Sequence, residues 1–253
     1  MDLPKTPSFR LDGRRALVTG ASRGIGLGAA VALAEAGAEV TFAARGADQL
    51  DAAVAAARVA GLKAQALALD VTDHDAVEAA FDATGPYHVV VNAAGMARHA
   101  PALKTTAEDY DAVMGLNLRA AYFLSQRAAE GMRGLGGGSI IHISSQMGHV
   151  GGIDRAVYAA SKHGVEGMAK SMAIEWGPLG IRVNTICPTF IRTPLTEATF
   201  ADPERVAWIT SKIKLGRTGE VEDVMGAVVY LASDASSLVT GSALLIDGGW
   251  TAG

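Results

Sequence analysis

The stretch Ala16-Leu17-Val18-Thr19-Gly20-Ala21-Ser22-Arg23-Gly24-Ile25-Gly26 decides the fold of this chain. A short apolar run with the character of a buried strand passes directly into three glycines with Gly-x-x-x-Gly-x-Gly spacing, and an Ala-rich helical segment follows. Glycine permits a tight turn and lets the backbone approach an anion, which the amides of a helix N-terminus attract. The spacing is a variant of the dinucleotide-binding fingerprint. A plain strand-to-helix turn, the alternative, would not require three glycines placed in this way.

Apolar β-rich runs alternate with Ala-rich helical stretches along the whole chain, which predicts an α/β protein with a parallel sheet. We expect strands near 14–20, 38–44, 62–70, 88–92, 138–144, 181–187 and 243–247. We expect helices near 24–36, 46–60, 73–84, 105–133, 155–176 and 220–233. No stretch has the composition of a linker, so residues 1–253 are predicted to form a single domain.

Composition excludes several classes of protein. The net charge of -4, with basic residues scattered along the chain, argues against a nucleic-acid partner. No apolar run is long enough for a membrane span, and Met1–Gly13 lacks the apolar segment of a signal peptide. The single cysteine, Cys187, permits no internal disulfide. These features predict a cytoplasmic protein with no membrane partner.

Two arginines indicate which dinucleotide is preferred. About 20 residues after the glycine turn, an acidic residue normally binds the ribose hydroxyls of NAD, whereas arginine accommodates the 2′-phosphate of NADP. This chain has Arg45 at the end of the second expected strand and Arg23 inside the turn, with no carboxylate between Phe42 and Arg45. NADP(H) is therefore preferred, and NAD(H) remains possible. Asp70, at the end of the third strand, is predicted either to accept from the adenine amino group or to cap a turn.

Tyr158 and Lys162 form a second candidate centre. In a helix, a four-residue step places the phenol and the ammonium on one face, one turn apart. A lysine in that position would stabilise a phenolate, which suits general acid or base chemistry. The Tyr-x-x-x-Lys spacing is a weak signal alone, so the surrounding motifs decide its meaning.

Those motifs, taken together, resemble the short-chain dehydrogenase/reductase family. The glycine turn, Asn92-Ala93-Ala94-Gly95, Ser144-Ser145 and the Tyr158/Lys162 pair occur in the family's order. The resemblance extends from Leu11 to Gly249 and implies a ketoreductase or sugar-dehydrogenase branch. It implies a three-layer, doubly wound Rossmann fold whose seven parallel strands have the order 3-2-1-4-5-6-7. It also implies a substrate lid at about 189–214 and a homotetramer.

The resemblance also implies the roles of individual residues. The catalytic residues are Asn117, Ser145, Tyr158 and Lys162. The cofactor-binding residues are Gly20, Ser22, Arg23, Gly24, Ile25, Gly26, Arg45, Asp70, Val71, Asn92, Ala93, Ala94, Gly95, Tyr158, Lys162, Pro188, Thr189, Ile191 and Thr193. The substrate residues are Ser145, Gln146, Ile153, Tyr158 and Trp208, with Met96, Arg98, His99, His149 and Asp154 expected nearby. For Asn117, the alternative is a core amide that kinks its helix. No His, Cys and carboxylate cluster has zinc-site spacing, so no metal is expected.

The expected activity is reversible hydride transfer between NADP(H) and a secondary alcohol or ketone of small size. Tyr158 would be the general acid or base, Ser145 would bind the substrate oxygen, and Asn117 would complete a water relay to Lys162. One alternative is an NAD-dependent sugar or polyol dehydrogenase resembling gluconate 5-dehydrogenase. Another is a nucleotide-binding regulator that retains the fold without turnover, because a fold alone does not determine function.

Overall fold

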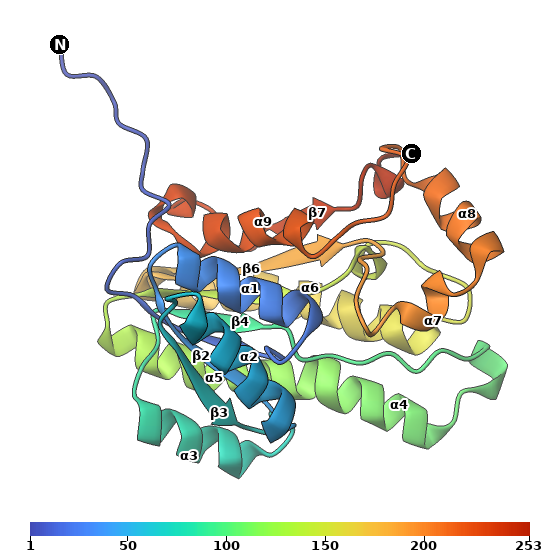
Figure 1. Cartoon of the computed structure of the whole chain (residues 1–253), viewed down its shortest axis with the longest axis horizontal. Helices are drawn as coiled ribbons and strands as arrows, with labels where there is room; N and C mark the ends of the chain where they lie inside the picture. Colours follow the sequence, from blue (N-terminus) through green and yellow to red (C-terminus); the bar gives the residue numbers. More distant parts are fainter.

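The computed structural model describes all 253 residues and contains one seven-stranded parallel sheet (Figure 1). The strands are β1 (Arg15–Thr19), β2 (Glu39–Ala44), β3 (Ala64–Ala68), β4 (Val89–Asn92), β5 (Gly138–Ile143), β6 (Ile181–Pro188) and β7 (Ala243–Ile246). Their order in the sheet is β3-β2-β1-β4-β5-β6-β7. The predicted fold class, strand order and single domain are confirmed.

Helices cover both faces of the sheet and make a three-layer structure (Figure 1). The helices of four or more residues are α1 (Gly24–Glu35), α2 (Ala47–Val59), α3 (His74–Thr84), α4 (Ala107–Met114), η2 (Gly115–Ala120), α5 (Ala121–Gly134), α6 (Ala156–Trp176), α7 (Glu197–Phe200), α8 (Pro203–Lys212) and α9 (Glu222–Ala232). Short 3-10 turns are η1 (Ala102–Lys104), η3 (Gln146–Gly148), η4 (Gly177–Leu179), η5 (Asp234–Ser236) and η6 (Trp250–Ala252). No helix is both long enough and apolar enough to cross a membrane.

Successive side chains of β1 pack alternately into two hydrophobic cores, one on each face of the sheet. Ala16 and Val18 pack in the layer of α1, α2 and α9, whereas Leu17 packs in the layer of α3, α5 and α6. All three side chains have 0% exposure. Because both faces of the sheet are covered, ligands can approach only at its edges, and open α/β sheets bind them at the carboxyl ends of the strands.

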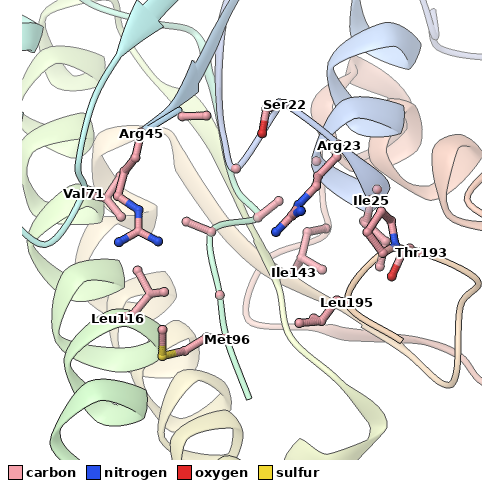
Figure 2. Close-up of a pocket in the computed structure, with 18 of the residues that line it drawn as sticks. Ser22, Arg23, Ile25, Arg45, Val71, Met96, Leu116, Ile143, Thr193 and Leu195 are labelled. Carbon is pink, nitrogen blue, oxygen red and sulfur yellow. The ribbon is translucent and has the colours of Figure 1, made fainter. Parts of the chain in front are cut away.

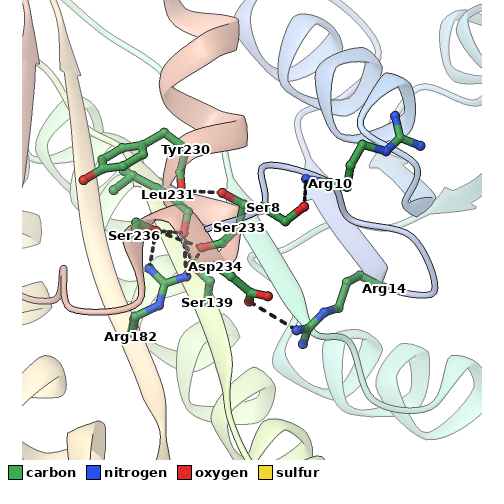
Figure 3. Close-up of polar contacts among 10 residues, drawn as sticks. All are labelled: Ser8, Arg10, Arg14, Ser139, Arg182, Tyr230, Leu231, Ser233, Asp234 and Ser236. Atoms are coloured by element: carbon green, nitrogen blue, oxygen red, sulfur yellow. Dashed lines mark hydrogen bonds and ion pairs between the residues drawn. The ribbon is translucent and has the colours of Figure 1, made fainter. Parts of the chain in front are cut away.

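The amino edge of the sheet is closed by a polar network (Figure 3). Arg182, at the start of β6, donates to the Leu231 carbonyl at 2.9 Å and to Ser236 Oγ at 2.8 Å. Ser139 Oγ, at the start of β5, donates to the same Leu231 carbonyl at 2.8 Å. These bonds attach the C-terminal end of α9 to the two strands, and the opposite edge stays available for a site.

The helix expected over 105–133 differs in detail. It consists of α4, the π-helical segment η2 and α5, with the wider turn centred on Asn117. The amide of Asn117 bonds outward, accepting from Met96 N at 2.9 Å and donating to Met96 O at 2.9 Å and Ser161 Oγ at 3.1 Å. A π-bulge of this kind often marks a functional position. The sequence prediction also missed α7, which is only four residues long, and α8, although Asp202 and Pro203 provide a cap and a first residue typical of a helix start.

Candidate active site

The site is a pair of adjoining cavities that share Tyr158 and Leu195. The larger cavity has a volume of about 610 Å³ and the smaller about 180 Å³. The larger one contains fifteen of the predicted cofactor residues: Gly20, Ser22, Arg23, Gly24, Ile25, Gly26, Arg45, Asp70, Val71, Ala93, Ala94, Gly95, Tyr158, Lys162 and Thr193. Figure 2 shows many of them around one space. The predicted residues Ser145, Gln146 and Thr189 line the smaller cavity.

The glycine turn has no room for side chains. Gly20 has a φ of +67°, and a Cβ there would lie 2.9 Å from the carbonyl carbon and oxygen of Ala93. A Cβ on Gly26 would lie only 2.2 Å from the Gly20 carbonyl oxygen. The turn therefore leads directly into α1, whose N-terminus opens on the larger cavity, the position that favours a pyrophosphate.

Charged side chains line the larger cavity. The guanidinium groups of Arg23 and Arg45 enter it from different segments (Figure 2). Asp70 lies 3.9 Å from Arg45, and its Oδ1 accepts from Thr72 N at 2.9 Å and from Thr72 Oγ1 at 2.7 Å. These hydrogen bonds, with help from Arg45, lower the pKa of Asp70. Asp70 thus caps a turn and also faces the cavity, so both predicted roles remain compatible with its position.

Helix α6 places Tyr158 and Lys162 together. Lys162 Nζ lies 5.6 Å from the centroid of the Tyr158 ring and donates to the Ile143 carbonyl at 2.9 Å. Lys162 is only 6% exposed, which makes its position well defined. Between them, Ser161 Oγ donates to the Tyr158 carbonyl at 2.7 Å and accepts from the Asn117 amide. The π segment and α6 are therefore joined at the Tyr-x-x-x-Lys turn.

Ser145 and Ser144 have different surroundings. Ser145 Oγ accepts from Met147 N at 3.1 Å and so begins η3, while the residue lines the smaller cavity beside Tyr158. Ser144 lines the larger cavity, and its buried Oγ has no hydrogen-bond partner. The two serines therefore belong to different cavities, and a contact from Ser145 to the substrate stays a prediction.

Six predicted site residues line neither cavity: Asn92, Asn117, Ile153, Pro188, Ile191 and Trp208. Asn92 is buried and its Oδ1 accepts from Thr19 Oγ1 at 2.7 Å. This hydrogen bond fixes the end of β4, where the loop begins. Asn117 uses its side chain to hold Met96. Ile153 is 83% exposed. Trp208 packs edge-on against Trp250, with ring centroids 5.6 Å apart. A direct contact from any of the six to a ligand stays a prediction.

Of the neighbouring residues that were expected, Met96 and His99 line the cavities, whereas Arg98, His149 and Asp154 do not. Arg155, which the sequence did not indicate, lines the smaller cavity with Tyr158. Arg155 is the N-cap residue of α6, with a φ of -125° that is not helical, so helical spacing from Tyr158 gave no signal for it.

A polar cluster lies behind η3 and was not indicated by sequence spacing. Cys187 Sγ is 3.2 Å from Glu166 Oε1 and 3.4 Å from His149 Nε2, and Thr185 Oγ1 donates to Glu166 Oε2 at 2.8 Å. Burial, together with Glu166, raises the pKa of the Cys187 thiol to about 12. These three potential metal ligands come from different elements, and the expected absence of a metal stays a prediction.

The fold and the site define a class: a Rossmann oxidoreductase with a tyrosine and a lysine at the junction of two cavities. Comparison with known proteins agrees. The family model described as "Enoyl-(Acyl carrier protein) reductase" matches residues 20–251. Gluconate 5-dehydrogenase of Gluconobacter oxydans (strain 621H) is 42% identical over 247 residues, covering 96% of each chain. L-xylulose reductase of Bos taurus is 40% identical over 245 residues, covering 96% of this chain and 99% of the relative.

A solved structure is similar throughout. It is the gluconate 5-dehydrogenase from Burkholderia cenocepacia J2315 in complex with NADP and tartrate, with a TM-score of 0.94 and 37% identity, covering 97% of this chain and 98% of that one. The chain belongs to the short-chain dehydrogenase/reductase family and is an oxidoreductase acting on CH–OH groups.

Proposed function

We propose that this enzyme transfers hydride reversibly between NADP(H) and a secondary alcohol or ketone of a sugar or polyol. The observation that carries the proposal is the position of Tyr158, which lines both cavities and has the Lys162 ammonium one helical turn away. A large cavity with a glycine turn fits a dinucleotide, and the smaller cavity beside it, lined by both polar and apolar residues, fits the substrate. Tyr158 lies where the dinucleotide and the substrate would contact each other.

The residues of the larger cavity fit NADP(H). The glycine turn leaves no space for a Cβ at Gly20 or Gly26, and Ser144 Oγ has no hydrogen-bond partner within the protein. Arg23 and Arg45 can form charge-assisted hydrogen bonds to a 2′-phosphate, and β2 ends at Ala44 without a carboxylate that would repel it. Relatives with NADP in their solved structures support this preference.

The chain's own residues would transfer the proton and form hydrogen bonds to the substrate oxygen. When bound, NADP(H) supplies or accepts the hydride. In reduction, Tyr158 Oη donates its proton to the carbonyl oxygen, and in oxidation it removes the proton from the hydroxyl. Ser145 Oγ donates a hydrogen bond to the same oxygen. Lys162 places positive charge beside the phenol, and the Asn117 segment would complete the water relay that restores the proton.

The smaller cavity favours a hydroxylated substrate. Gln146 is 1% exposed, and neither amide atom of its side chain has a partner; Thr189 Oγ1 is also buried and unpaired. Buried polar groups require hydrogen-bond partners, so a ligand with several hydroxyl groups would satisfy them. The names of relatives, which include gluconate 5-dehydrogenase, D-erythrulose reductase and D-threitol dehydrogenase, support sugars and polyols as the substrate class.

The segment 189–214, which contains α7 and α8, would act as a substrate lid, because Leu195 and Thr196 from it line the smaller cavity. A homotetramer would form through the long helices near 105–133 and 155–176. Tyr110 and Tyr122, which are 47% and 46% exposed on α4 and α5, provide apolar surface for it. A cytoplasmic location agrees with the unpaired Cys187. Light scattering on the purified protein would measure the subunit number.

The test of the function is Tyr158→Phe. Turnover of sugar and polyol substrates, followed at 340 nm with NADPH or NADP⁺, should fall by about 100-fold or more, because general acid–base catalysis contributes that amount. NADPH binding, measured by fluorescence, should stay within about twofold of the original, since the hydroxyl is not part of the phosphate-binding turn. Undiminished turnover would show that another group transfers the proton. Tight NADPH binding with no turnover of any substrate by the unaltered enzyme would favour the regulator instead.

A further inference from the structure

The smaller cavity contains an arginine that no carboxylate neutralises. Arg155 Nη1 donates to His99 Nε2 at 2.6 Å, and the guanidinium carbon lies 5.3 Å from the centroid of the Phe190 ring. No salt bridge of the structure includes Arg155. The histidine and the aromatic ring thus hold the guanidinium in place, while most of its five N–H donors remain available.

The surroundings of Arg155 are positive at neutral pH. Burial lowers the pKa of His99 to about 4, and Arg155 and Arg205 add to the effect, so His99 is a neutral acceptor. Arg205, on α8, lies close enough to lower the pKa of Arg155 as well, after the larger effect of burial. The opposing charge near them is Asp154. Two arginines against one aspartate leave an uncompensated positive charge at the cavity.

Polar groups without partners lie in the same cavity. The Gln146 amide and the Thr189 hydroxyl are buried and make no hydrogen bond within the protein. A neutral polyol could satisfy these two groups but would leave the half-buried guanidinium unpaired when it displaced water. An unpaired buried charge costs more than an unpaired hydroxyl, so the cavity as a whole favours an anion that carries hydroxyl groups.

We propose that Arg155 binds the carboxylate of the substrate, which makes sugar acids, that is aldonates and keto-aldonates, the preferred substrate class. His99 is a positioning residue that orients the guanidinium. This inference rests on the proposed function, because Tyr158 is taken to mark the reacting carbon. Arg155 and Tyr158 line the same small cavity, so both groups can contact one small molecule. The carboxylate and the reacting hydroxyl then belong to the same carbon chain.

The test compares two ligands of equal length, D-gluconate and the neutral polyol D-glucitol. Binding is measured by calorimetry on the full-length Tyr158→Phe protein saturated with NADP⁺, where no turnover interferes. Introducing Arg155→Gln into the Tyr158→Phe protein should weaken D-gluconate binding by about 10- to 100-fold, because a charge-assisted, bidentate hydrogen bond to the carboxylate is lost. D-glucitol binding should change by less than about twofold. Arg14→Gln, at the opposite edge of the sheet, is the matched control and should change neither.

Kinetics on the active enzyme give a second measurement. Arg155→Gln should raise KM for D-gluconate and leave kcat nearly unchanged, since the contact is made equally in the ground and transition states. Arg155→Lys should recover only part of the loss, because an ammonium lacks the planar fork. Equal weakening of both ligands, or no binding of D-gluconate by the protein with Arg155 intact, would overturn the proposal.

The two proposals can fail separately. Arginine-dependent binding of D-gluconate without any turnover would retain the carboxylate site and reject the reductase chemistry. Efficient turnover of neutral polyols, with no effect of Arg155→Gln on sugar acids, would retain the chemistry and reject the carboxylate site.

Discussion

Replacing Arg45 by alanine should reduce the use of NADPH without reducing the use of NADH. Hydrogen bonds to a charged group contribute about 1.5–3 kcal/mol, and the 2′-phosphate carries close to two negative charges at neutral pH. The Arg45 side chain is 68% exposed, and the Asp70 carboxylate 3.9 Å away already offsets part of its charge. Solvent screening therefore reduces the expected contribution to about 1–2 kcal/mol, or about 5- to 30-fold in kcat/KM.

The assay measures initial rates at 340 nm with NADPH and with NADH at a fixed saturating concentration of substrate. NADH lacks the 2′-phosphate, so its kcat/KM should change by less than about twofold, and the loss with NADPH should shrink as salt is added. Arg14→Ala is the control, because Arg14 is also exposed and pairs with an aspartate, Asp234, at 3.4 Å, but lies at the opposite edge of the sheet. Equal losses with both cofactors would show that Arg45 supports the fold of the loop rather than the phosphate, and would refute the reasoning.

Three further perturbations test the structure elsewhere. Gly26→Ala should destabilise the protein by about 1–3 kcal/mol, visible as a lower Tm, because its Cβ would lie 2.2 Å from a carbonyl oxygen; Gly167→Ala, where a Cβ meets nothing within 4 Å, should not lower it. Iodoacetamide at pH 8 should label Cys187 slowly until urea is added, since burial raises the pKa of its thiol to about 12; rapid labelling of the folded protein in mass spectrometry would contradict this. Arg217 lowers the pKa of Asp223 from 3.8 to about 2, so this pair stabilises the fold fully above about pH 4 and loses its effect as the pH falls through 2. Urea unfolding from pH 6 to 2 should show that loss in the original protein and not in Asp223→Asn.

Much of this protein follows from local sequence. The alternation of apolar strands and Ala-rich helices predicted every strand of the sheet; the central strands are buried on both faces and leave a strong local signal, and the edge strands β3 and β7 follow from their place in the alternation. The glycine turn was predictable for a similar reason: positive φ at Gly20 and the close approach at Gly26 depend on residues within a few positions. The Tyr158/Lys162 spacing needs only the geometry of one helix.

The tertiary structure decided the features that join distant segments. Asn117 interrupts a long helix with a π segment because its amide bonds to Met96 and Ser161, which lie 21 and 44 residues away in the chain. Arg155 contacts His99 and Phe190, which lie 56 and 35 positions away in the chain, and these contacts hold its guanidinium in the smaller cavity. Local sequence patterns determined the strands and helices, the glycine turn and the Tyr158/Lys162 spacing, because all of these depend on residues that are near one another in the chain. The smaller cavity depended on packing, which brings together side chains whose spacing in the chain carries no such signal.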